Sequence, residues 1–102
     1  MAKYRLSRRA SSDIEGIAQY SAERFGTRQA IAYVTDIHDA ARLVAEISSL
    51  GRPYTTKKGR TYQRYNVGNH ALFYRTTDEG VFVVRILHQA MDLDRRLDGG
   101  ER

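Results

Sequence analysis

The chain of 102 residues contains no cysteine. Neither a disulfide framework nor a thiolate metal site can therefore form, and we expect no metal or other cofactor. The stability of the fold must come from packing. With 41% hydrophobic residues the sequence can bury one modest core, so we predict a single domain over residues 1–98 and a mobile tail over residues 99–102.

Long apolar runs are also missing. The N-terminus, MAKYRLSRRASSDIEG, lacks the apolar segment of a secretion signal. No stretch approaches the roughly 20 apolar residues that a membrane-spanning helix needs. We therefore predict a soluble, cytoplasmic protein that has no membrane partner.

Acidic residues are absent from residues 52–75, which we call the basic segment. The whole chain has 17 Lys and Arg against 12 Asp and Glu, a net charge of +5 and a pI near 9.8. The cations of the basic segment are Arg52, Lys57, Lys58, Arg60, Arg64 and Arg75. Such a charge distribution favours an anionic partner, either a nucleic acid or an acidic protein segment.

Local signals predict a strand and then a helix at the start of the chain. Lys3–Leu6 alternates polar and apolar residues, which is typical of a short strand at a sheet edge or beside a hairpin. Ser7 or Ser12 can cap a helix that spans about Arg8–Phe25. Gly26 ends this helix, because glycine adopts the left-handed conformation after a helix at the least cost.

A second amphipathic helix is predicted over Thr27–Ser49, and the residues GRP at 51–53 stop it. The turn between the two helices is so short that they must pair antiparallel. The apolar face of the second helix must then bury itself against a sheet. His38 on this helix is interpreted as a solvated surface residue.

A polar, basic loop is predicted over residues 54–60, followed by a strand over residues 61–67. Tyr65 and Val67 of this strand face one side of the sheet. The residues on the opposite side are Tyr62, Arg64 and Asn66.

Residues 71–74 and 81–87 predict a β-hairpin of central strands that are covered on both faces. The register stays open. Asp78 and Glu79 could form a two-residue loop, or Gly80 could take the left-handed position of a three-residue loop with a bulge. After the hairpin, residues 91–97 predict a short helix capped by Asp92 or Asp94. The fold class is therefore α+β, an antiparallel helix hairpin packed on a small antiparallel sheet.

Two polar residues lie in or next to the apolar run at 81–87. A guanidinium keeps its charge, so Arg85 must reach solvent, a ligand or a carboxylate, with Asp13 and Asp92 as the internal candidates. The simplest interpretation is that the aliphatic part of the Arg85 side chain covers the sheet while its guanidinium is solvated. His88 either ends the last strand through a structural hydrogen bond or acts directly in function.

A resemblance spans nearly the whole chain. The residues that carry it are Leu6-Ser7, Ala10, Asp13-Ile14, Ile17 and Tyr20; Gly51-Arg52-Pro53; Tyr65 with Val67-Gly68; Phe73-Tyr74-Arg75; and Val84-Arg85-Ile86-Leu87-His88 with Asp92. In this order and at these spacings the chain resembles the ParE branch of the RelE/ParE toxins of bacterial toxin–antitoxin modules.

The resemblance implies a toxin without enzymatic activity that poisons DNA gyrase. It also implies a ParD-like antitoxin, whose acidic amphipathic tail binds the apolar groove between the helix pair and the sheet. The toxin would then be connected to DNA only through this antitoxin. The residues we propose for target or antitoxin binding are Lys57, Lys58, Arg60, Arg64, Arg75 and Arg85.

Two other functions stay open. The first is a ribosome-dependent mRNA endonuclease like the RelE branch, which needs cations and proton-transfer groups. Its candidate catalytic residues would be Arg64, Arg75, Arg85 and His88. RelE-like enzymes keep a tyrosine near the C-terminal end, and none follows His88. The second is a nucleic-acid-binding module in which bases stack on Tyr54, Tyr62, Tyr65 and Tyr74.

Overall fold

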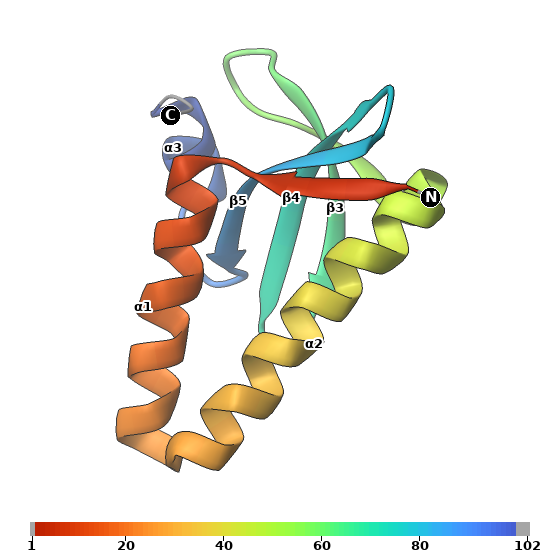
Figure 1. Cartoon of the computed structure of the whole chain (residues 1–102). Helices are drawn as coiled ribbons and strands as arrows, with labels where there is room; N and C mark the ends of the chain where they lie inside the picture. Colours follow the sequence, from red (N-terminus) through yellow and green to blue (C-terminus); the bar gives the residue numbers. More distant parts are fainter. Residues whose placement is uncertain (1, 100–102) are drawn as a thin grey trace.

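A computed structural model describes residues 2–99 (Figure 1). Its elements are β1 (Lys3–Leu6), α1 (Arg8–Phe25), α2 (Thr27–Glu46), the 3₁₀ turn η1 (Ser48–Leu50), β2 (Arg52–Thr55), β3 (Thr61–Val67), β4 (His70–Thr77), β5 (Gly80–His88) and α3 (Leu93–Asp98). The α+β class is confirmed. Of the tail predicted over residues 99–102, all but Gly99 lies outside the described residues.

The five strands form one sheet in the order β1-β5-β4-β3-β2. The meander β3-β4-β5 is antiparallel as predicted, but β1 pairs in parallel with β5, so the sheet is mixed. A parallel pair needs a long connection, and the chain from α1 to β4 supplies it. Figure 1 shows α1 and α2 joined at one end of the molecule and diverging towards the sheet.

The strands of the hairpin and the last helix differ by a few residues from their predicted bounds, and two further boundaries differ as well. The basic loop predicted to start at Tyr54 begins later, because Arg52–Thr55 forms a strand, β2, paired with β3. Pro53 is compatible with β2 because an edge strand has one side without sheet hydrogen bonds. Helix α2 ends at Glu46 rather than Ser49, since Ile47 leaves helical geometry with φ −131° and ψ 77°.

The structure settles the register of the β4–β5 hairpin. Thr77 lies opposite Gly80, so Asp78 and Glu79 form the two-residue loop. A Cβ on Gly80 would lie 1.9 Å from the Lys3 carbonyl oxygen, and glycine therefore allows β1 to approach this closely.

A bulge shifts the same hairpin by one residue. Phe73 lies opposite Arg85, whereas Tyr74 lies opposite Val83, so β5 contains one extra residue. Beyond the bulge, His70 faces His88 across the two strands. The bulge thus decides which side chains share each end of the sheet.

The sheet has two covered faces, which we call the helix face and the outer face. On the helix face, α1 and α2 cover the larger core, whose buried members include Ile37, Val44, Leu72, Tyr74, Val83 and Ile86. On the outer face, α3 covers a smaller core that contains Tyr62, Ala71, Phe73, Val84, Leu87 and Leu97. The predicted split of β3, with Tyr65 and Val67 on one side and Tyr62 on the other, is confirmed.

Ser7 fixes the start of α1. Its Oγ accepts a hydrogen bond from the Ala10 amide at 2.9 Å, as an N-cap does, and donates to the Val84 carbonyl at 2.6 Å. Ser7 is therefore the cap, while Ser12 lies inside α1. The same hydroxyl joins the helix to β5 at the bulge.

Tyr74 fixes the other end of the helix hairpin. Its buried hydroxyl donates to the Ser48 carbonyl at 2.7 Å and accepts from the Gly51 amide at 3.0 Å. A Cβ on Gly51 would lie 2.3 Å from this oxygen, so the close approach requires glycine. The end of α2 and the start of β2 are thus held against the centre of the sheet.

Candidate functional site

Arg85 is a buried member of an ion pair, and the whole residue is 7% exposed. Its Nε and Nη2 donate to the two Asp13 carboxylate oxygens at 2.8 and 2.9 Å, and its Nη1 donates to the Arg96 carbonyl at 3.3 Å. Asp13 also accepts from the Ile86 amide at 3.0 Å. The interpretation of a solvated guanidinium is therefore wrong: Asp13, one of the two candidate carboxylates, neutralises it.

A cleft of about 770 Å³ lies between α1, the end of β5 and the segment after it. Its rim exposes large apolar side chains, with Tyr20 57%, Phe25 61% and Met91 41% accessible. The polar residues that line it include Asp13, Tyr33, His70, Arg85, His88 and Arg96. The predicted groove between helix pair and sheet is present, with polar lining residues that were not all foreseen.

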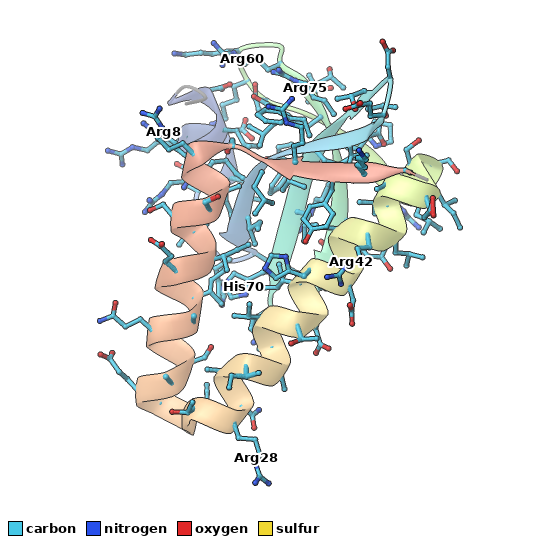
Figure 2. The ribbon with its side chains drawn as sticks, viewed as in Figure 1. Arg8, Arg28, Arg42, Arg60, His70 and Arg75 are labelled. Atoms are coloured by element: carbon cyan, nitrogen blue, oxygen red, sulfur yellow. The ribbon has the colours of Figure 1, made fainter. Side chains whose placement is uncertain are left out.

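His70 lies at this cleft and is tied to α2 by Tyr33. Figure 2 shows the His70 side chain between α1 and α2. Tyr33 Oη lies 2.6 Å from His70 Nδ1 and accepts from the Asn69 amide at 3.2 Å. The ring of His70 packs edge-on against that of His88, with centroids 5.2 Å apart. Burial, and then the charge of His88, lower the pKa of His70 below its ordinary 6.5, so the ring is neutral at pH 7.

The other two histidines have structural hydrogen bonds. His88 ends β5, and its Nδ1 accepts from the Ala90 amide at 3.0 Å, which is the structural role considered for it. Because an amide N–H can only donate, His88 Nδ1 is the acceptor of this bond. His38 is not a solvated surface residue: it is half-buried, and its Nδ1 lies 2.6 Å from Tyr4 Oη.

The β2–β3 loop of the basic segment has acidic side chains of α3 beside it in the folded protein. The Lys57 amide donates to Asp94 at 2.8 Å, and the Thr56 hydroxyl donates to Asp98 at 2.6 Å. The Tyr54 hydroxyl also donates to Asp94. Burial and this hydrogen bond raise the pKa of Tyr54 to about 12, and the same bond lowers the pKa of Asp94. Carboxylates of α3 therefore fasten the loop.

The cations of this loop nevertheless point outwards. The Lys58 amide bonds Asp98 at 3.3 Å, but the side chains of Lys57, Lys58 and Arg60 are exposed. Figure 2 shows Arg60 at the end of the molecule remote from the tip of the helix hairpin. These three proposed contact residues thus form one exposed group.

Arg64 and Arg75 lie on the outer face over aromatic rings. The Arg64 guanidinium carbon is 5.9 Å from the ring centroids of both Tyr54 and Phe73. That of Arg75 is 5.1 Å from the ring of Tyr62. Cation–π contacts of this kind hold the positive charge in place at the surface.

The four residues considered for RNA cleavage have different surroundings. Arg85 and His88 line the cleft, whereas Arg64 and Arg75 stack on rings of the outer face. The four tyrosines considered as a stacking platform do not share one exposed surface. Tyr62 and Tyr74 are fully buried, and Tyr65 and Tyr74 belong to the core on the helix face.

Sequence reasoning missed His70 and Tyr33. A two-residue loop without a bulge would place His70 opposite Leu87, and only the extra residue in β5 brings it to His88. No local signal in the sequence marks that bulge. The role of Tyr33 could not be predicted because its hydrogen-bond partner, His70, lies 37 residues away in the sequence.

The comparisons with known proteins agree with this geometry. Residues 4–93 match the family model described as ParE toxin of type II toxin–antitoxin system, parDE. The chain is 37% identical to Toxin ParE1 of Caulobacter vibrioides over 92 residues, which cover 90% of this chain and 94% of that relative. It is 38% identical to Toxin ParE1 of Mycobacterium tuberculosis over 96 residues, which cover 93% and 97%.

Among solved structures, the chromosomal ParDE TA system from P. aeruginosa shares the fold. Its TM-score is 0.69 at 15% sequence identity, and the match covers 86% of this chain and 96% of that one. Fold and sequence together define the class of protein first, a toxin of a type II toxin–antitoxin system. Within that class, the chain belongs to the ParE toxin family. The resemblance predicted from the sequence is thereby confirmed.

None of the helices in the described part of the chain is long and apolar enough to cross a bilayer. Within residues 2–99, no group of three His, Asp or Glu side chains is arranged to hold a metal ion.

Proposed function

We propose that this toxin acts in the cytoplasm by poisoning DNA gyrase, without an enzymatic reaction of its own. We further propose that a ParD-like antitoxin neutralises it by placing an acidic amphipathic tail in the cleft. Membership of the ParE family supports both parts. The observation that carries the second part is the cleft itself, with its exposed apolar rim and with Arg96 in its lining.

The rim suits an amphipathic partner. Tyr20, Phe25 and Met91 expose apolar surface beside one cleft, and clustered exposed apolar side chains mark an interaction site. A helix that binds in a groove uses apolar anchors on one face and leaves its polar face outside. Acidic residues of such a tail would lie near Arg96, which lines the same cleft.

The antitoxin part is tested by changing the rim. Tyr20→Ser and Phe25→Ser remove side chains that are mostly solvent-exposed, so the melting temperature should hold while antitoxin affinity falls by about 2 kcal/mol for a central anchor. Ile31→Ser is the matched control, because Ile31 is 63% exposed but does not line the cleft. Equal affinity of all three variants in calorimetric titration would place the tail elsewhere.

The gyrase part is tested with purified components. The toxin should inhibit supercoiling by gyrase and leave cleaved DNA, while translation in a ribosome extract continues. Asp13 already binds the Arg85 guanidinium, one of the cations considered for RNA cleavage, which supports a mechanism without that reaction. Codon-specific cuts in mRNA with unaffected gyrase would favour the RelE-like endonuclease instead.

The exposed loop cations are proposed as contacts that steer a negatively charged partner. Changing Lys57 and Lys58 to Glu should slow association with the antitoxin at low salt and weaken its salt dependence. The fold should persist, because the backbone amides of these residues, not their side chains, bind the carboxylates of α3. An unchanged association rate in stopped-flow measurements would remove the loop from the interface.

A further inference from the structure

The outer face of β2 and β3 carries two arginines that repel each other. Arg52 lies directly opposite Arg64 in the antiparallel pair, so both side chains project from the same face. Arg64 fixes which face this is, because its guanidinium lies over Tyr54 and Phe73 of the outer core. Like charges in this register destabilise a sheet, and neither the cleft nor the core requires them.

Nothing within residues 2–99 neutralises this pair. Neither Arg52 nor Arg64 has a carboxylate within ion-pair distance in this part of the chain, and Arg64 uses one donor on the Asn66 side chain at 3.0 Å. The acidic residues Asp94 and Asp98 of α3 accept hydrogen bonds from Tyr54 of β2 and from amides and a hydroxyl of the β2–β3 loop. The arginine pair is therefore left with open donors for an external anion.

The chemistry of the surface favours phosphate groups on a double helix. A guanidinium presents a planar fork of donors that matches a phosphate. Single-stranded nucleic acid would need exposed rings for base stacking, but Tyr62 is 1% and Phe73 0% accessible beneath the arginines. Contact with phosphates alone requires no access to bases. The exposed Lys57 and Lys58 follow β2 directly and extend the charged surface.

We propose that the outer face binds double-stranded DNA directly, through its phosphates and without reading sequence. The contacts come from Arg52 and Arg64 on the strands and from Lys57 and Lys58 on the adjoining loop. This site is distinct from the cleft, and it shares only Lys57 and Lys58 with the loop contact proposed above for the antitoxin. It replaces the expectation that the toxin meets DNA only through its antitoxin.

The test measures the fluorescence anisotropy of a short labelled duplex of mixed sequence, with no gyrase or antitoxin present. Each phosphate contact contributes about 0.9 to the slope of log K against log salt, so four contacts give a slope near −3.6. Affinity should then fall roughly 150-fold between about 50 and 200 mM salt. The double variant Arg52→Gln/Arg64→Gln should reduce the slope by about 1.8.

Two controls separate a site from general attraction of a basic protein. Arg28→Gln removes an exposed arginine at the tip of the helix hairpin, remote from Arg60 and Arg75 in Figure 2, and should leave the slope unchanged. The double variant Arg52→Lys/Arg64→Lys keeps both charges and should restore the slope. Thermal unfolding of every variant shows that the fold is retained.

Two results would overturn the proposal. One is a salt slope that responds equally to Arg28→Gln and to Arg52→Gln/Arg64→Gln. The other is no duplex binding at about 50 mM salt, the low-salt end of the range over which phosphate contacts are strong. If polyglutamate bound under those conditions, the surface would belong to an acidic protein partner instead. A toxin that fails to inhibit gyrase would not change these DNA-binding measurements, because neither gyrase nor antitoxin is present in them.

Discussion

Arg85 and Arg64 lie in neighbouring parts of one sheet, among apolar and aromatic residues, and yet their surroundings differ completely. Arg85 is 7% exposed and holds a carboxylate through two hydrogen bonds, whereas Arg64 lies half-buried on two rings with no acid beside it. A charge neutralised inside the protein serves the fold. A charge held at the surface without a carboxylate is available to a partner.

A similar contrast separates the two faces of the sheet. On the helix side, side-chain polar groups such as those of Ser7, Asp13 and Tyr74 bridge helices to strands. On the outer face, β2 and β3 place like charges opposite each other. The first arrangement stabilises the fold, and the second reduces its stability slightly and suits an anionic partner.

The largest expected effect comes from breaking the internal pair. Arg85→Met should lower the free energy of unfolding by about 3–5 kcal/mol, because it leaves the Asp13 carboxylate buried without its cation. Chemical denaturation measures this loss. Adding Asp13→Asn to Arg85→Met should recover part of it, since the stranded charge is gone. A loss below about 1 kcal/mol, the scale of an exposed ion pair, would mean that solvent already screens Asp13.

A smaller loss is expected from removing the buried hydroxyl of Tyr74 on the helix face. Tyr74→Phe leaves the Ser48 carbonyl and the Gly51 amide without their partner and should cost about 1–3 kcal/mol. Tyr65→Phe is the matched control on the same face, because the Tyr65 hydroxyl has no hydrogen-bond partner within residues 2–99. Equal melting temperatures for the two variants would show that the Tyr74 hydroxyl does not anchor the end of α2.

A substitution on the outer face should raise the stability of the fold instead of lowering it. Arg52→Glu converts a repulsive cross-strand pair with Arg64 into an attractive one and should raise stability by about 0.2–1 kcal/mol. Arg5→Glu changes the net charge equally at an exposed site on β1, where Arg5 lies opposite the uncharged Phe82, and serves as the control. If the two variants gain equally, the effect comes from net charge and not from the register of β2 and β3.

The smallest effect concerns pH and the cleft. The pKa of His70 in the folded protein lies below its value of 6.5 in the unfolded chain, so the unfolded state binds more protons between those two values. Stability should therefore fall as the pH decreases below about 6.5 towards the lowered pKa. His70→Gln should flatten this part of a melting-temperature profile against pH. An unchanged profile in His70→Gln would assign the dependence to other groups.

Much of the fold followed from local sequence signals. Ser7, Gly26 and the GRP segment at 51–53 mark helix ends through short-range chemistry, and the structure has those ends within a few residues. The two faces of β3 follow from strict alternation along one strand. Such signals need no information from distant residues.

The candidate site depended on distant residues. Arg85 demanded an anion on physical grounds, but only the packing of α1 against β5 chose Asp13 over Asp92. The basic segment is acid-free along the chain, yet α3 brings Asp94 and Asp98 to its loop from about 40 residues away. Charge patterns describe composition, and the tertiary fold decides which charges meet.

The sequence by itself determined the class of fold, the helix hairpin, the meander and the family, because these depend on periodicity, on turn residues and on an ordered set of motifs. Only the tertiary structure decided the parallel pairing of β1, the bulge that brings His70 to His88, and the cross-strand pair of Arg52 and Arg64. Each of these depends on strand register. Register follows from how whole elements pack, since a shift of one residue sends every side chain of a strand to the opposite face.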